Sequence, residues 1–314
     1  MQYTEVVLGM VAGLVLFLYG VSRLATGMRA VAGERMQRML ARATTNRFAG
    51  VATGTIATTV LDSSSVTIIM VIALVDAGLL TFQASLGVIL GANIGTTISS
   101  QLIALDVQKY SPIVLGIGGL IMFAGRSESW RHAGMAVFGI GLVFFGLSQM
   151  GAAVQPLKDS ARFTAWMTQL ENPAYGVLAG AIITVVLQSS SATVGIAITL
   201  ASQDLLKLPA GVAIMLGAEI GTCADTLLAT LGRSRDALRA GIFHLLFNVL
   251  TVIVGVSLLN PLVNFVVSLG GGTAQQIASA HVTFNVVGAA ALVLFLAPIG
   301  ALLERIVPSQ GAVG

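Results

Sequence analysis

The chain has 314 residues, of which 56% are hydrophobic and 9% are charged, and its mean hydropathy is +0.92. Because a soluble domain carries about 25% charged residues, this composition excludes a soluble, fibrous or disordered protein. The formal net charge is +3, and the single cysteine, Cys223, cannot form an internal disulfide.

The apolar segments predict an all-α polytopic membrane protein. A membrane-spanning helix needs about 20 mostly apolar residues, so the segment 112–125 is short for a span. In chain order we expect a span at 5–27, an amphipathic cytoplasmic helix at 28–47, a helical hairpin at 48–76, spans at 82–105, 112–125 and 133–151, a second hairpin at 174–202, and spans at 208–231, 240–259 and 280–303.

The placement of basic residues predicts the orientation. With seven crossings, one side of the membrane receives twelve Arg residues and the other receives four Lys or Arg residues. The positive-inside rule makes the first side cytoplasmic. We therefore expect an inner-membrane protein with its N-terminus outside and its C-terminus in the cytoplasm. The Arg residues of 28–47 fit this topological role better than specific lipid binding.

The chain contains an internal repeat. Residues 54–105 align with residues 180–231 at a constant offset of 126, with 22 identities in 52 positions. Low complexity is a poor explanation for SSSxT and GAxIGT recurring in one register. The alignment predicts two structural repeats, at 1–155 and 156–314.

The direction of the second repeat depends on the Ser-rich segments. Residues 48–62 would form a helix of about 22 Å, which is short of a full span. If each Ser-rich segment is a re-entrant hairpin, three crossings separate the hairpins and the repeats are inverted; if each crosses once, the repeats are parallel. The polar centre at 62–65 is costly against lipid but acceptable at a turn that lines a cavity, which favours inverted repeats.

Consecutive serines lie at the expected hairpin tips. The second half-helix begins at each tip, so its free N–H groups and the positive end of its dipole suit an oxyanion. The carbonyl groups that end the first half-helix suit a hard cation. Thr67 and Thr193 lie one turn further along. The tip serines are Ser63, Ser64, Ser65, Ser189, Ser190 and Ser191.

The two GAxIGT blocks place glycines around a polar residue in the middle of spans 82–105 and 208–231. Glycine permits a local helix break, so we expect one broken transmembrane helix in each repeat. The polar residues would then face the same central cavity as the serines. The alternative is close helix packing on small residues. The polar residues are Asn93, Thr96, Glu219 and Thr222.

No fixed cation is expected at the centre, because the Lys and Arg residues lie in loops or at segment ends. Asp62 and Glu219, in contrast, are central. A bound anion would therefore need mobile cations, or protons on the two acids. This indicates a cation-coupled anion symporter or a cation carrier.

These motifs resemble those of the type II sodium-dependent phosphate cotransporters, a family with two inverted repeats that each carry a QSSS motif and a GANIGT-like block. Residues 188–191 match the first motif and residues 91–96 match the second. The resemblance implies sodium-coupled import of inorganic phosphate by alternating access. It also suggests a homodimer, and a bacterial member without a PhoU-like domain.

The resemblance also implies roles for individual residues. The six tip serines would bind phosphate, and Na+ would be the coupling ion. The implied cation ligands are Asp62, Gln188, Asn93, Thr96, Glu219, Thr222, Thr67 and Thr193.

The chain departs from the family pattern at two of these positions. Asp62 stands where the family has Gln, and Glu219 stands where it has Asn. A proton-coupled or other-anion symporter is therefore one alternative, and a phosphate-binding membrane regulator without transport is another. No Ser-His-Asp, Walker or GxGxxG signature occurs, so we expect no enzyme, no cofactor beyond Na+ and no nucleic-acid partner.

Two H-x-x-F-N-V segments begin at His244 and His281. A proton relay or metal site is one interpretation. Helix packing and hydrogen bonding is favoured, because no Cys or acidic partner lies at ligand spacing. Asp225 either lines the cytoplasmic path or lies solvated near the end of its span.

Overall fold

The computed structural model describes residues 2–42, 46–105 and 108–308, and within these residues every regular element is helical. The α-helices of this part of the chain are α1 (Gln2–Arg42), α2 (Arg47–Leu61), α3 (Ser64–Asp76), α4 (Phe82–Ala104), α5 (Ser111–Ala124), α6 (Glu128–Val154), α7 (Ala161–Gln169), α8 (Pro173–Leu187), α9 (Ser190–Ser202), α10 (Leu208–Gly221), α11 (Cys223–Leu228), α12 (Arg235–Ser257), α13 (Leu259–Ser268), α14 (Thr273–Val293) and α15 (Leu296–Ile306).

Six stretches of the described chain are long and apolar enough to cross a membrane: α1, α4, α6, α10 with α11, α12 and α14. A seventh would be α7 with α8, which are bent by 97° at their junction. The chain is therefore an all-α integral membrane protein, as its composition predicts.

The first helix differs from the expectation. A span at 5–27 and a separate amphipathic helix at 28–47 were expected, but α1 runs unbroken to Arg42. The reason is that residues 28–42 are mostly strong helix formers such as Arg, Met, Leu, Ala and Gln. Residues 43–45 lie outside the described chain, and Asn46 caps the next helix by accepting from the N–H groups of Phe48 and Ala49.

The last expected span, at 280–303, is wrong in its limits. α14 begins at Thr273 and ends at Val293, and α15 follows as a separate helix. Pro298 explains the break, because its ring would clash with the carbonyl of Leu294 in a continuous helix. That carbonyl instead accepts from Arg47 Nη1 at 3.1 Å. The short helix α13 was not expected from the sequence.

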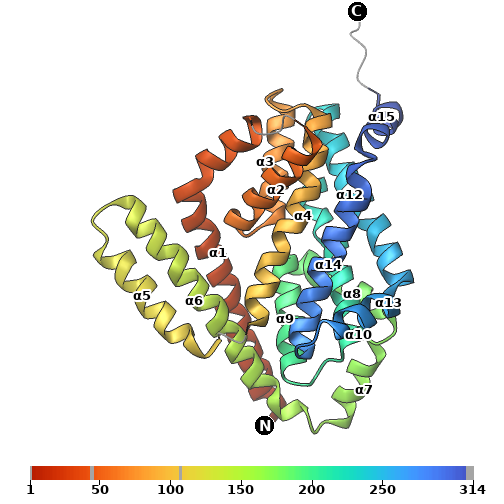
Figure 1. The fold of residues 1–314 in the computed structure, drawn as a ribbon. Coiled ribbons are helices and arrows are strands. Elements are labelled where there is room, and N and C mark those ends of the chain that lie inside the picture. The colour runs from red at the N-terminus through yellow and green to blue at the C-terminus, as the bar shows by residue number, and fades with distance from the viewer. Residues whose placement is uncertain (1, 43–45, 106–107, 309–314) are drawn as a thin grey trace, which may run out of the picture.

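The helices form a bundle with an arm at one side. α6 runs along α1, and α5 packs on the outer side of α6, so that this pair extends from the body (Figure 1). In the body, α4 lies against α2, α9 and α14, and α10 lies against α8, α9 and α12. α1 begins at the opposite end of the molecule from α15 (Figure 1).

The expected break at the first GAxIGT block is wrong, because α4 continues through residues 91–96. Its glycines serve close packing instead. A Cβ at Gly91 would overlap the carbonyl oxygen of Val51 in α2. In the second repeat, a Cβ at Gly217 would likewise overlap the carbonyl oxygen of Val177 in α8. There a short interruption does occur, at Thr222 between α10 and α11.

Candidate functional site

Two helix–turn–helix tips define the site. Asp62 is the C-cap residue of α2 and Gln188 is the C-cap residue of α8, each with left-handed backbone dihedrals. The next residue of each tip caps the following helix. Ser63 Oγ accepts from Val66 N–H at 3.2 Å, and Ser189 Oγ accepts from Ala192 N–H at 3.1 Å. Two residues thus separate α2 from α3, and two separate α8 from α9.

The two tips meet around one cavity of about 100 Å³, although they are 126 residues apart in sequence. The sequence predicted this meeting. α1 supplies the remaining wall. The lining residues are Val21, Ser22, Ala25, Asp62, Ser63, Ser64, Ser65, Val66, Gln188, Ser189, Ser190 and Ser191.

The geometry of the tip cavity suits an oxyanion. The N-terminal ends of α3 and α9 both lie at the cavity, and first-turn N–H groups have no partner within their own helix. The positive ends of the two helix dipoles add to this donor set. The serine hydroxyls can donate to an anion as well.

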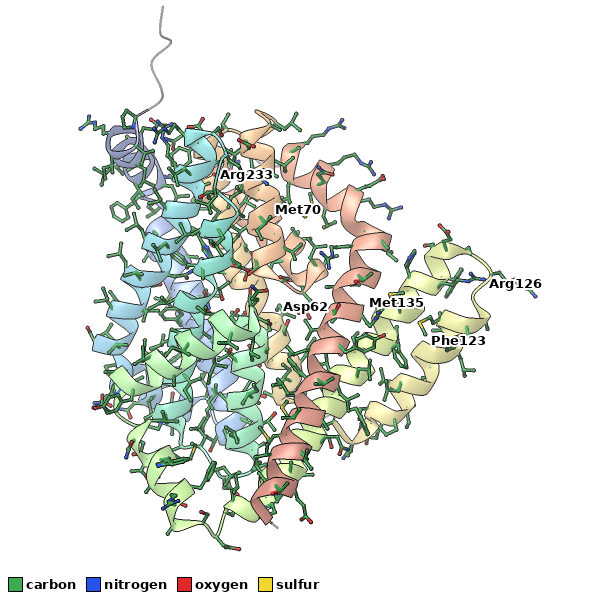
Figure 2. The ribbon with its side chains drawn as sticks, turned by 180° about the vertical axis from the view of Figure 1, so that it is seen from behind. Asp62, Met70, Phe123, Arg126, Met135 and Arg233 are labelled. Atoms are coloured by element: carbon green, nitrogen blue, oxygen red, sulfur yellow. The ribbon has the colours of Figure 1, made fainter. Side chains whose placement is uncertain are left out.

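Two carboxylates stand beside the serines. Asp62, about midway between the two ends of the molecule (Figure 2), accepts a hydrogen bond from the Ser99 hydroxyl of α4. Asp225 of α11 accepts one from the Ser65 hydroxyl. The sequence left the position of Asp225 open, because its contact with the other repeat cannot be inferred from spacing. The structure places it at the first tip.

None of the described residues that line the tip cavity is Lys or Arg. The broader expectation that all basic residues lie in loops or at segment ends is wrong for Arg23. Because α1 continues to Arg42, Arg23 lies inside that helix, beside Ser22 of the cavity wall. Its guanidinium stacks on the Tyr19 ring, 4.6 Å from the centroid.

Most of the expected cation ligands lie outside the tip cavity and bond to backbone carbonyls of their own segment. Asn93 Nδ2 donates to Ile89 O at 2.9 Å. Four threonine hydroxyls likewise donate to backbone carbonyls, at 2.9 to 3.3 Å: those of Thr67, Thr96, Thr193 and Thr222. Only Asp62 and Gln188, of the expected ligands other than serine, line the cavity.

Glu219 is also outside the tip cavity, and it contacts one of the two recurrent histidines. Its Oε1 atom lies 2.6 Å from His281 Nε2 and accepts from Asn285 Nδ2 at 3.1 Å. The expected hydrogen-bonding role of the H-x-x-F-N-V segment is therefore present. The acidic partner does not lie at ligand spacing, as expected, but 62 residues away in sequence.

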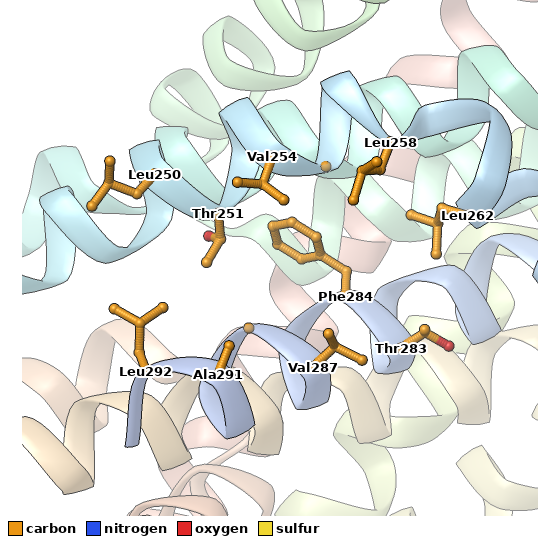
Figure 3. A pocket seen from close by; sticks show the side chains of 12 residues that line it. Leu250, Thr251, Val254, Leu258, Leu262, Thr283, Phe284, Val287, Ala291 and Leu292 are labelled. Carbon is orange, nitrogen blue, oxygen red and sulfur yellow. The ribbon is translucent and has the colours of Figure 1, made fainter. Parts of the chain in front are cut away.

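Two other cavities are less suited to an anion. One of about 200 Å³ shares Val21, Asp62 and Ser191 with the tip cavity and is otherwise mostly apolar. Another, of about 240 Å³, lies between α12 and α14 and is bordered by residues such as Leu250, Phe284 and Val287 (Figure 3). Because the first cavity is mostly apolar and the second offers almost no polar surface, neither suits phosphate as well as the tip cavity does.

Comparison with known proteins gives a family match in both halves. The sequence profile of the Na+/Pi-cotransporter family matches residues 16–152 and again residues 149–271. YqeW of Bacillus subtilis is 29% identical over 96% of this chain and 97% of its own length. No solved structure matches the chain significantly.

Two further relatives carry names that mention phosphate. YjbB of Salmonella typhimurium is 25% identical over 96% of this chain and 56% of its own length. Its name is putative inorganic phosphate export protein. The human sodium-dependent phosphate transport protein 2B is 30% identical over 40% of this chain and 20% of its own length.

Proposed function

The chain belongs to the Na+/Pi-cotransporter family, and we propose that it is a secondary transporter of inorganic phosphate. The observation that carries this proposal is the tip cavity, where two helix N-termini and the six tip serines converge. A phosphate oxyanion matches this donor set, and a secondary transporter needs no catalytic side chains. The phosphate ligands are Ser63, Ser64, Ser65, Ser189, Ser190 and Ser191.

Sodium is the proposed coupling ion. The tip cavity contains an acid, Asp62, and no basic side chain among its described lining residues. An anion there needs a mobile counter-charge, which Na+ supplies when it binds with phosphate. Asp62 and Gln188 are the proposed ligands in the cavity, and Asp225 is a further one beside Ser65. The bonds of Asn93 and the four threonines use their donor groups, so the amide oxygen and the hydroxyl oxygens keep lone pairs for the ion.

The proposed transport cycle uses two inverted repeats, 1–155 and 156–314, each with a re-entrant hairpin. Equivalent glycine contacts in α2–α4 and α8–α10 support a shared architecture. The tips would open alternately to each side of the inner membrane, with the N-terminus outside and the C-terminus in the cytoplasm. A homodimer in the lipid bilayer is the proposed assembly.

Import is the proposed direction, because an inward sodium gradient would drive phosphate inward through a symporter. The name of YjbB indicates export for that relative. Transport by the purified protein reconstituted in liposomes distinguishes phosphate import from phosphate export. Labelled phosphate is measured in liposomes with an inward sodium gradient, with potassium in place of sodium, and with phosphate preloaded inside.

We expect sodium-dependent uptake that is lost in Ser191→Ala, a cavity serine that caps no helix. Equal uptake with a proton gradient would favour the proton-coupled alternative, for which the acid at Asp62 is the motivating residue. Binding of phosphate without flux, in folded protein, would favour a membrane regulator and contradict transport.

A further inference from the structure

A buried imidazole joins three helices at a point outside the tip cavity. His281 Nδ1 of α14 lies 2.7 Å from Ser100 Oγ of α4, and His281 Nε2 lies 2.6 Å from Glu219 Oε1 of α10. Asn285 donates to the same carboxylate oxygen from one turn further along α14. His281 is 0% exposed and Glu219 is 4% exposed, so water does not solvate this contact.

A carboxylate at such a position needs a partner of opposite charge. An unpaired buried charge costs several kcal/mol, and a hydrogen-bonded counter-charge offsets this cost. His281 is the ionisable side chain that contacts the Glu219 carboxylate, at 2.6 Å. Glu219 thus meets its charge requirement from within the protein.

The other titratable groups nearby have different partners. Cys223 Sγ contacts the backbone oxygen of Glu219, and His244 Nδ1 lies 2.9 Å from Thr226 Oγ1. Asp225 accepts from Ser65 at the tip. The carboxylate of Glu219 is therefore hydrogen-bonded to α14 and to no other acid or base among the described residues.

The first repeat places a neutral group at the equivalent position. Asn93 lies 126 residues before Glu219, and its Nδ2 donates to the carbonyl of Ile89. The amide of Asn93 needs no counter-charge, whereas Glu219 has the His281 imidazole beside it. Asp62 is different, because it lines the tip cavity and accepts a hydrogen bond from a hydroxyl, that of Ser99.

We propose that His281 takes the place of a coupling cation at Glu219. No sodium ion binds at this carboxylate, and the pair instead holds α10 against α14 and, through Ser100, against α4. His281 is a positioning residue in this assignment, and the coupling ions are confined to the tip cavity. The inference rests on the proposed sodium-coupled function, and it excludes Glu219 from the sodium ligands of that function.

Sodium-dependent thermal stabilisation of the purified protein tests this without a transport assay. Ligand that binds the folded state raises its melting temperature according to its affinity, so the half-saturating sodium concentration is the readout. We expect Glu219→Gln to leave this concentration within about twofold of wild type, whereas Asp62→Asn raises it about tenfold. A tenfold rise in Glu219→Gln would overturn the proposal. Glu219→Asn, which copies Asn93, serves if the Gln variant does not fold.

A second measurement uses the unmodified protein. The chain has three histidines, so ¹⁵N-histidine NMR gives few signals, which His132→Gln and His244→Gln assign. We expect the His281 signal to be the same in sodium and in potassium. A sodium-induced shift of that signal would overturn the proposal. His244→Gln is also the matched control, because its imidazole bonds to Thr226 rather than to an acid, and it should leave the His281 signal in place.

The two readouts separate failure of this inference from failure of sodium coupling. If wild-type protein gains no stability from sodium, sodium coupling at the tips is contradicted. In that case the proposal of an ion-free Glu219–His281 pair is still supported if the His281 signal is the same with and without sodium and shifts in the Glu219→Gln variant. It is overturned if that signal ignores the Glu219→Gln change, because the pair would not exist in solution.

Discussion

Asp62 and Gln188 end α2 and α8 in the same left-handed backbone conformation, with φ of 51° and 53°. Such a conformation costs a residue other than glycine roughly 1–2 kcal/mol. Both turns tolerate this cost with different side chains, one an acid and the other an amide. The turn therefore does not dictate the side chain, which leaves these two positions available for ligand chemistry.

Exchanging these side chains tests the sodium site. We expect Asp62→Gln to fold, because Gln188 already occupies the same conformation, and to raise the half-saturating sodium concentration of phosphate uptake about tenfold through loss of one nearby charge. The reciprocal change Gln188→Asp should lower that concentration. Uptake measured over a sodium series in liposomes gives both values. Unchanged sodium dependence in both variants would contradict a cation site at the turns.

The serines of the two tips should separate into two classes. Ser63→Ala removes the cap of α3, so we expect a loss of about 1 kcal/mol in the free energy of unfolding as well as weaker phosphate binding. Ser191→Ala, at the equivalent of Ser65 in the other tip, removes a cavity hydroxyl that caps nothing, so stability should be nearly unchanged while phosphate binding weakens. Thermal unfolding and phosphate titration of each purified variant distinguish these effects. Equal destabilisation by both changes would contradict the assignment.

The turn at each tip was predictable from the sequence because it depends on local signals. Ser63 and Ser189 are strong N-cap residues that follow an apolar helix, and the recurrence in register implies that both tips have one architecture. Whether the helix breaks at the two GAxIGT blocks was not predictable in the same way. Glycine permits both a break and a close contact, and which one occurs depends on a partner such as Val51, forty residues before Gly91.

The pairing of Glu219 with His281 was hidden for a similar reason. The two residues lie on different helices, 62 positions apart, so no spacing rule brings them together. The departure from the family pattern at Glu219 was a hint, since an added acid in a buried position requires a compensating group. Only the packing of α14 between α4 and α10 identifies that group as His281.

The packing role of the glycines is tested by Gly91→Ala. The added methyl group would overlap the carbonyl oxygen of Val51, and overpacking of a well-packed contact costs about 1–3 kcal/mol or more. We expect a lower melting temperature and lower yield of folded protein. Gly116→Ala is the matched control in a helix, because nothing lies within 4 Å of its added Cβ. Its melting temperature should be unchanged or higher, and an equal loss in both variants would contradict the packing role.

The link between Asp76 and the segment before α12 should make stability depend on acid pH. The backbone N–H of Ser234 donates to the Asp76 carboxylate at 2.7 Å, and Arg233 lies beyond it, so the pKa of Asp76 is lowered from its ordinary value of 3.8. A carboxyl with a lowered pKa in the folded state stabilises the fold above its unfolded pKa and loses this effect as the pH falls through its folded pKa. We therefore expect Asp76→Asn to lower the melting temperature slightly at neutral pH and to flatten its decline below about pH 4. Melting curves of both proteins across this range measure the difference, and parallel declines would show that Asp76 does not contribute.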